Sequence, residues 1–338
     1  MKRDLLFISA QPDDFYYLWQ VHTWLESLKQ IGCSDKAISL VFTPADREPN
    51  PQWQQLVDLY PESKFFFQRD EDRISRFLGL YIPILRPYVL SKYFHLHPEL
   101  KEKAIFYCDA DVVFTKYPDI DKFLEDDINY LSDTKSYISA SYFDSKVKDV
   151  LPERLEEYKK RDILNEITWM TGISREIAEK NEESSGGAQY LLKNIDGAFW
   201  DKVFEDCLVI RQYLMTINTQ FFGSENKGFQ SWCSDMWAVL WGLWRRNQET
   251  QIVPEMKFAW SSDSIEKLDN VSILHNAGIA GEYQGDIPVF YKGLYHNNTN
   301  PFEGNKLFGL LNNEKNKTLC NNEYIKQMLN TNKKHQLT

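Results

Sequence analysis

Two aspartates one residue apart, Asp109 and Asp111, are the residues of this sequence best suited to chemistry. Their carboxylate oxygens can bind one hard divalent cation, which prefers oxygen ligands and bridges phosphate oxygens well. Such a cation neutralises charge that develops on a departing diphosphate. A solvated turn is the alternative, because turns favour Asp. The flanking residues at 106–108 and 112–114 are apolar, however, and burying two carboxylates without a cation is costly, so the sequence predicts a metal site.

The elements that must position this pair alternate between short apolar runs and longer helical segments, a pattern typical of βα units in a mostly parallel sheet. We expect strands at 5–10, 37–43, 64–68 and 104–108, and helices at 15–28, 52–59, 86–96, 199–213 and 235–244. Gly32 is expected to end the first helix. Ligands of such sheets bind beyond the carboxyl ends of the strands, which is where Asp109 begins. The predicted fold class is α/β, with a mixed, mostly parallel sheet flanked by helices.

The composition of the chain indicates which partners and which cellular compartment to expect. Lys and Arg number 39 against 49 Asp and Glu, so the net charge of -10 disfavours nonspecific binding of nucleic acid, although a local basic groove stays open. The five cysteines have no C-x-x-C spacing and their odd number fits no closed disulfide framework, which indicates free thiols. No stretch is typical of a signal peptide or a transmembrane segment, so we expect a cytoplasmic protein.

With a D-x-D motif at the end of a predicted central strand, the chain resembles the GT-A glycosyltransferases, whose metal-binding D-x-D lies at the same place. The resemblance extends over residues 5–281 and is firmest over 86–114. The chain most resembles the group of hydroxyproline arabinosyltransferases and peptidyl-serine galactosyltransferases. Three segments carry this resemblance: the Arg-Pro-Tyr helix that begins at Arg86, the D-x-D at 109–111 and the Gly-Gly pair at 186–187. The resemblance implies a GT-A (Rossmann-like) fold, a UDP-sugar donor, Mn²⁺ or Mg²⁺, and transfer with retention of anomeric configuration.

The resemblance also implies which residues face the nucleotide. In GT-A enzymes a basic residue on the helix before the D-x-D strand often does so, and Arg86 and Lys92 match that layout, with a solvated helix face as the alternative. Asp109 would also contact the nucleotide. The end of the first strand supplies the rest of the pocket in such enzymes, which implies Ser9, Ala10 and Gln11.

Two later segments complete the expected donor site. Paired glycines let backbone approach a ligand closely, and GT-A enzymes commonly line the donor sugar with such a strand, which implies Gly186, Gly187 and Gln189. The alternative is a turn that enters a strand. His275 resembles the late histidine that completes the metal or diphosphate site in several retaining families, and imidazole is a common ligand of manganese. A structural histidine is the alternative there.

On the acceptor side, the resemblance implies a role for Asp235 near the start of a predicted helix. An acidic residue at this point in GT-A enzymes often reaches the acceptor or the reacting sugar, so Asp235 is the expected catalytic and acceptor-binding residue, and a helix N-cap is the alternative. Trp232 is close in sequence and offers an aromatic face on which a sugar can stack. The tryptophans that follow it in the helix are first of all a packing stripe.

We expect one catalytic domain over residues 1–300 and a C-terminal tail over 301–338. Within the domain, 1–114 would bind the nucleotide, 115–183 would be a charged helical insertion, and 184–300 would bind donor and acceptor. The acceptor stays open among a glycan, a peptide and a modified base, since phage-type DNA glycosyltransferases transfer arabinosyl or glucosyl to hydroxymethylcytosine. A sugar-phosphate nucleotidyltransferase and a non-catalytic carbohydrate-binding protein are the alternatives from other classes.

Overall fold

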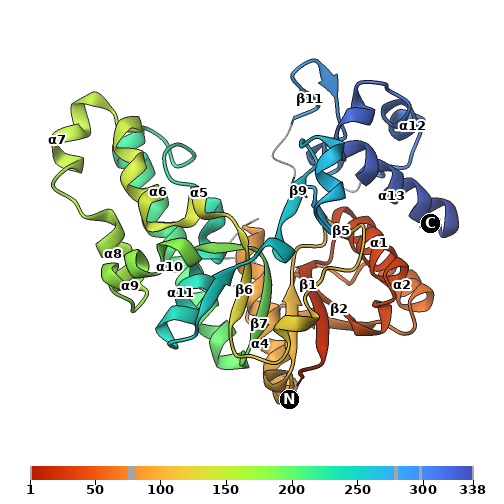
Figure 1. Ribbon diagram of the computed structural model, residues 1–338, viewed down its shortest axis with the longest axis horizontal. Coiled ribbons are helices and arrows are strands. Elements are labelled where there is room, and N and C mark those ends of the chain that lie inside the picture. Colours follow the sequence, from red (N-terminus) through yellow and green to blue (C-terminus); the bar gives the residue numbers. More distant parts are fainter. Residues whose placement is uncertain (1, 75–80, 278–280, 297–298, 337–338) are drawn as a thin grey trace. The chain divides into compact units, whose positions relative to one another are not determined.

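The computed structural model describes residues 2–74, 81–277, 281–296 and 299–336 (Figure 1). The chain forms two compact units, each assembled from segments that are distant in sequence. The first unit comprises Met1–Asp4, Arg76–Ile105 and Phe123–Val253, and the second comprises Leu5–Ser75, Phe106–Lys122 and Pro254–Thr338. The expected grouping of residues 1–300 as one catalytic domain stays a prediction.

A parallel ladder forms the centre of the second unit. Its strands β1 (Leu5–Pro12), β2 (Ala37–Thr43) and β3 (Lys64–Arg69) lie in the order β3-β2-β1, and β2 is buried along its whole length. Parallel strands covered on both faces are continuous apolar runs, which is why the sequence predicted them to within two residues. Helices α1 (Phe15–Gln30) and α2 (Trp53–Leu59) connect these strands.

Helix α1 begins and ends at residues that the sequence marks. The side chain of Asp14 accepts a hydrogen bond from the Tyr16 N–H at 2.8 Å and is the N-cap. Gly32 follows the helix with φ of +74°, a left-handed conformation that glycine adopts without a steric penalty, so the predicted helix end is confirmed.

A second, smaller sheet in this unit was not predicted. Strand β10 (Ile273–His275) pairs antiparallel with β5 (Val112–Phe114) and parallel with β9 (Phe258–Trp260), and the short hairpin of β11 (Tyr283–Gln284) and β12 (Ile287–Pro288) follows it in the chain. The register places His275 opposite Val112. This pairing joins segments about 160 residues apart, which local periodicity does not reveal.

The C-terminal residues correct the expectation of a peripheral tail. They form α12 (Lys306–Leu311) and α13 (Cys320–Lys334), and α13 packs beside α1 (Figure 1). Tyr324, Ile325 and Met328 on α13 are fully buried. These three residues share one face of the helix at helical spacing, but the Asn- and Lys-rich composition of the segment makes this apolar face hard to recognise in the sequence.

The first unit contains strands β6 (Asn129–Asp133), β7 (Gly186–Lys193) and β8 (Thr250–Ile252). Strand β6 is antiparallel to β7 and parallel to β8. Strand β4 (Ala104–Tyr107) is divided between the two units, at Ile105 and Phe106. Because most strand pairs are parallel and helices flank them, the predicted α/β fold class is confirmed.

Three longer helices of this unit surround its core: α4 (Ile82–Leu96), α10 (Gly197–Phe222) and α11 (Ser234–Arg245). We expected α4 to begin at Arg86, but it begins four residues earlier because the apolar residues 82–85 continue its buried face, and Pro83 rather than Pro87 lies in its first turn. Helix α10 begins two residues earlier and ends nine residues later than expected, and the left-handed Gly223 follows its last residue.

Short helices make up much of the charged segment before β7. It forms five short helices, α5 (Lys135–Ile138), α6 (Ala140–Ser145), α7 (Leu155–Tyr158), α8 (Ile163–Met170) and α9 (Arg175–Lys180). Helices α6, α8 and α9 each have an N-cap whose side chain accepts a hydrogen bond from a backbone N–H of the first turn. These N-caps are Ser139, Asp162 and Ser174.

Candidate functional site

An acidic and imidazole cluster lies at the start of the second sheet in the second unit. Asp109, Asp111 and His275 each offer a ligand atom, and these atoms all lie within 4.8 Å of one another. The Nε2 atom of His275 is 3.3 Å from Oδ1 of Asp111. Two carboxylates and an imidazole match the ligands that Mn²⁺ takes in proteins, so the residues present fit a divalent cation.

Local backbone pairing builds this cluster. The Cys108 N–H donates to the Ile8 carbonyl at 3.2 Å, which places Asp109 just past the end of β4. The Asn276 N–H donates to the Asp111 carbonyl at 3.0 Å and continues the β5–β10 ladder, so His275 lies next to Asp111. The sequence predicted this proximity through the resemblance alone. Gly278, which we expected in the loop after His275, lies outside the described residues.

Lys292 is a fourth member of the cluster that the sequence analysis missed. Its amine forms an ion pair with Oδ2 of Asp111, and both side chains are buried. Burial on its own would raise the pKa of Asp111, but Lys292 and then His275 more than offset it and hold the pKa of that carboxyl below its ordinary value. Asp111 is therefore held in its ionised form. A lysine between Tyr291 and Gly293 has no local motif that could have revealed it.

Aromatic side chains surround the cluster. The rings of Trp260 and Phe258 have their centroids 5.1 and 5.8 Å from that of His275. Tyr16 and Tyr324 lie within electrostatic range of Asp111, and burial above all raises the pKa of both phenols. Because both tyrosines stay neutral, neither adds negative charge to the cluster.

The predicted nucleotide residues at the end of β1 are buried and engaged with one another. The Gln11 amide donates to Ser39 Oγ at 2.8 Å and to the Leu40 carbonyl at 2.9 Å, and it accepts from Ser9 Oγ at 3.0 Å. Ala10 is also buried. These hydrogen bonds explain why the polar side chains of Ser9 and Gln11 can be buried without a ligand. Their role in nucleotide binding stays a prediction.

A second group of predicted residues lies in the first unit. Arg86 on α4 and Asp235 on α11 form an ion pair with an N–O distance of 3.4 Å, and each side chain is 14% exposed. Burial raises the pKa of Asp235 and Arg86 lowers it, which leaves it above the ordinary value. Helix α11 begins at Ser234 with Cys233 as its N-cap, so the alternative explanation of Asp235 as an N-cap is wrong.

Trp232 and Lys92 lie in the same unit. Trp232 is 57% exposed, and its ring meets that of Tyr81 edge-on with a centroid distance of 5.3 Å. The Tyr81 hydroxyl donates to the Trp232 carbonyl at 3.0 Å, which fixes an exposed aromatic face in place. Lys92 lies over the ring of Tyr88 at 5.0 Å, a cation–π contact within α4.

The glycines of β7 have a packing explanation. A Cβ atom on Gly186 would lie 2.5 Å from the Ser132 carbonyl oxygen, and one on Gly187 would lie 2.7 Å from the Tyr190 hydroxyl. Gln189 is buried and accepts from Ser132 Oγ at 2.8 Å. The strand pairing of β6 and β7 thus requires the first glycine whether or not a sugar binds, and the predicted sugar contacts stay a prediction.

Comparisons with known proteins give a fold similarity. No protein-family model and no curated protein matches the sequence. The structure is similar to that of the galactosyltransferase LgtC in complex with donor and acceptor sugar analogues, with 11% identity over 84% of this chain and 90% of that chain and a TM-score of 0.42. It is also similar to mouse xyloside xylosyltransferase 1, with 11% identity over 81% and 98% of the two chains and a TM-score of 0.35.

The bifunctional glycosyltransferase WbbM is a third similar structure, with 8% identity and a TM-score of 0.41. The similarity covers 82% of this chain but 46% of WbbM, so the chain spans less than half of that protein. All three are glycosyltransferases by name, and the similarity concerns their fold. In the part of the chain that the structure describes, every helix is too short or too polar to cross a membrane.

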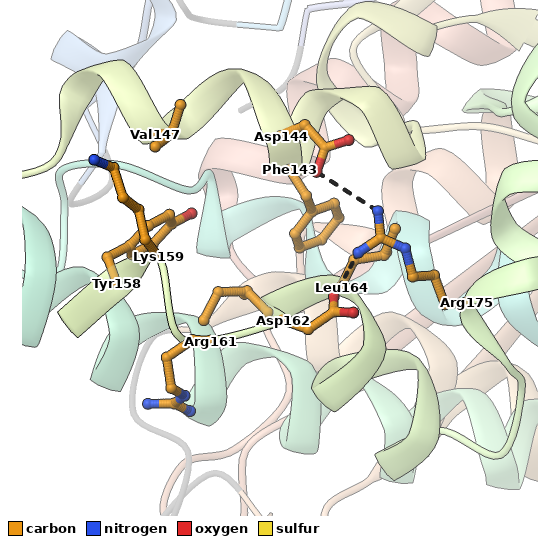
Figure 2. A pocket seen from close by; sticks show the side chains of 10 residues that line it. Phe143, Asp144, Val147, Tyr158, Lys159, Arg161, Asp162, Leu164 and Arg175 are labelled. Atoms are coloured by element: carbon orange, nitrogen blue, oxygen red, sulfur yellow. Dashed lines mark hydrogen bonds and ion pairs between the residues drawn. The ribbon is translucent and has the colours of Figure 1, made fainter. Parts of the chain in front are cut away.

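A separate cavity of about 420 Å³ lies among the short helices of the first unit. Figure 2 shows Arg175 pointing toward Asp144 and Asp162, with N–O distances of 3.8 and 2.6 Å, near the ring of Phe143. No residue that we predicted for the site lines this cavity. Each basic residue that lines it already has an acidic partner, so we assign the cavity no part in the chemistry.

Proposed function

We propose that the protein is a metal-dependent glycosyltransferase that moves a sugar from a UDP-sugar to an acceptor hydroxyl, with retention of configuration. The cluster of Asp109, Asp111 and His275, in which Asp111 and His275 are buried, carries the proposal. When bound, the cation would supply Lewis-acid stabilisation of the diphosphate leaving group. The three side chains would hold it, and the apolar surroundings would strengthen their attraction for it by excluding water.

Lys292 adds a positive charge that does not depend on the metal. Its amine is held against Asp111 in a buried environment, where a charge acts more strongly than in water. An ammonium is a compact phosphate ligand. We therefore assign Lys292 to the diphosphate, whose charge grows as the bond to the sugar breaks.

The residues that the sequence predicts for the sugar and the acceptor lie in the first unit. The carboxylate of Asp235 is buried against Arg86, so each orients the other. A carboxyl group there can form hydrogen bonds with sugar hydroxyls. The exposed face of Trp232 suits stacking against an acceptor sugar, which favours a glycan acceptor over a peptide or a DNA base. The net charge of -10 also disfavours DNA.

A donor screen tests the proposal directly. Purified protein is incubated with UDP-sugars and Mn²⁺ or Mg²⁺, first without acceptor and then with glycan, peptide or modified-DNA mixtures, and released UDP is measured. We expect UDP release that needs the metal, that EDTA stops and that Asp111→Asn abolishes. Pyrophosphate formed from a sugar phosphate and an NTP would instead establish a nucleotidyltransferase, and sugar binding that survives EDTA without turnover would establish a binding protein.

A further inference from the structure

Asn321, at the start of α13, has a side chain that pairs with the backbone of the segment carrying Lys292. Its Oδ1 accepts from the Phe290 N–H at 3.0 Å, and its Nδ2 donates to the Phe290 carbonyl at 3.2 Å. The side chain is 1% exposed. Asn321 therefore satisfies both polar groups of one peptide segment two residues before Lys292, in a place where an unpaired group would be costly.

The backbone of Asn321 reaches the other side of the cluster. Its N–H donates to the Ser261 carbonyl at 2.7 Å, and the Ser261 N–H donates to the His275 carbonyl at 3.3 Å. One residue thus links the segment that carries Lys292 to the strand that carries His275. Both side chains meet on the carboxylate of Asp111.

Ring packing strengthens the same link. Phe290 stacks with Tyr324, which follows Asn321 by one helical turn, with a centroid distance of 6.2 Å and an interplanar angle of 22°. Phe290 also meets Trp19 of α1 edge-on at 5.8 Å. The backbone at Phe290 is therefore fixed from two directions, and the next residues have little freedom.

We propose that Asn321 is a positioning residue that holds Lys292 against Asp111, so that the C-terminal helix is part of the diphosphate site. The inference rests on the proposed function only for its catalytic consequence. The positional part concerns this chain alone. The proposal gives a positioning role to a segment that the sequence composition predicted to be a C-terminal tail.

The positional part is tested by lysine accessibility. Native protein is acetylated briefly with acetic anhydride, and each lysine is quantified by peptide mass spectrometry in wild type, Asn321→Ala and the milder Asn321→Asp. We expect acetylation of Lys292 to rise about tenfold in Asn321→Ala, which loses both side-chain hydrogen bonds to Phe290, and less in Asn321→Asp, which keeps the acceptor. Lys193, fully buried and paired with Asp126 at 2.5 Å, is the internal reference and should not change.

Met328→Ala is the matched control, because Met328 is a buried residue of α13 that makes none of the Asn321 hydrogen bonds. It should lower the melting temperature and leave Lys292 acetylation unchanged. If Asn321→Ala leaves Lys292 protected, or if Met328→Ala exposes Lys292 equally, the helix acts as general support and the inference is wrong.

The catalytic consequence is tested by UDP binding in the presence of Mn²⁺, measured by calorimetry. Asn321→Ala should weaken UDP binding about tenfold, and it should add nothing to Lys292→Met in the double variant. Additive losses would overturn the inference while the proposed function stands. If Lys292→Met leaves UDP binding unchanged, the proposed role of Lys292 fails, and the acetylation result still decides whether Asn321 positions it.

Discussion

Replacing Lys292 with methionine should have opposite effects on metal binding and on turnover. The Lys292 amine is paired with the same Asp111 carboxylate that a cation would use, and both groups are buried. A cation must therefore compete with the ammonium. Methionine keeps most of the side-chain volume and removes the charge, so Asp111 becomes fully available to the metal.

The size of the effect follows from that ion pair. A hydrogen bond to a charged group contributes about 1.5–3 kcal/mol, which corresponds to a tightening of the Mn²⁺ dissociation constant by roughly 10- to 150-fold. Turnover should move the other way, because loss of a charge that stabilises the leaving diphosphate costs on the order of 100-fold in kcat. A variant that was merely misfolded would lose both properties.

Calorimetric titration with MnCl₂ and a UDP-release assay measure the two quantities on the same preparation. Lys315→Met is the matched control, since Lys315 pairs with Asp286 on the surface and is 61% exposed. Both its metal affinity and its turnover should equal those of wild type. Mn²⁺ affinity that is unchanged or weaker in Lys292→Met would refute competition at Asp111, whatever happens to turnover.

Three further predictions concern single side chains. Asp111→Asn should remove the increase in melting temperature that Mn²⁺ gives to wild type, about 2.7 kcal/mol of stabilisation at a metal concentration 100 times Kd, and a retained increase in thermal melts would place the metal elsewhere. Burial and then His335 lower the pKa of His22 to about 4. The free energy of unfolding should therefore be highest above pH 6.5, the ordinary pKa of histidine, and should fall by roughly 3 kcal/mol as the pH drops toward 4. In urea titrations at several pH values, the free energy of unfolding of His22→Gln should depend less on pH. Because the pKa of buried Asp235 is raised, its protonated form is favoured in the fold, and the stability of wild type relative to Asp235→Asn should decrease as the pH rises from about 4 to 7; a constant difference would contradict the shift.

The elements predicted best are those whose signal is local. Strand β2 is a continuous apolar run, and α1 has apolar residues at helical spacing between Asp14 and the left-handed Gly32. Such patterns follow from burial and from helix geometry within one segment. The predicted start of α4 was four residues too late, because the first turn contains Pro83 and Pro87 lies inside the helix.

The site could be predicted only where a motif is short and contiguous. Asp109 and Asp111 are visible because two carboxylates interrupt an apolar stretch, whereas Lys292 meets Asp111 across 181 residues of sequence. The small sheet of β5, β9 and β10 has three residues in each strand, too few for an alternating pattern to be recognised. The position of His275 is set by that sheet, so the geometry came from long-range pairing even though the residue was predicted.

The same reasoning explains why α13 was overlooked. Asn321 acts through both polar atoms of its amide, and such a side chain contributes polarity to the composition of a segment, which counts against a buried position. In the fold it is buried because it satisfies the backbone at Phe290, where an apolar residue would leave two unpaired groups. A polar residue can therefore be required in a core because the backbone is polar, and sequence periodicity, which counts only apolar positions, cannot detect that requirement. If the proposal for Asn321 is correct, the geometry at Asp111 depends on such a residue of α13 as much as on the D-x-D motif.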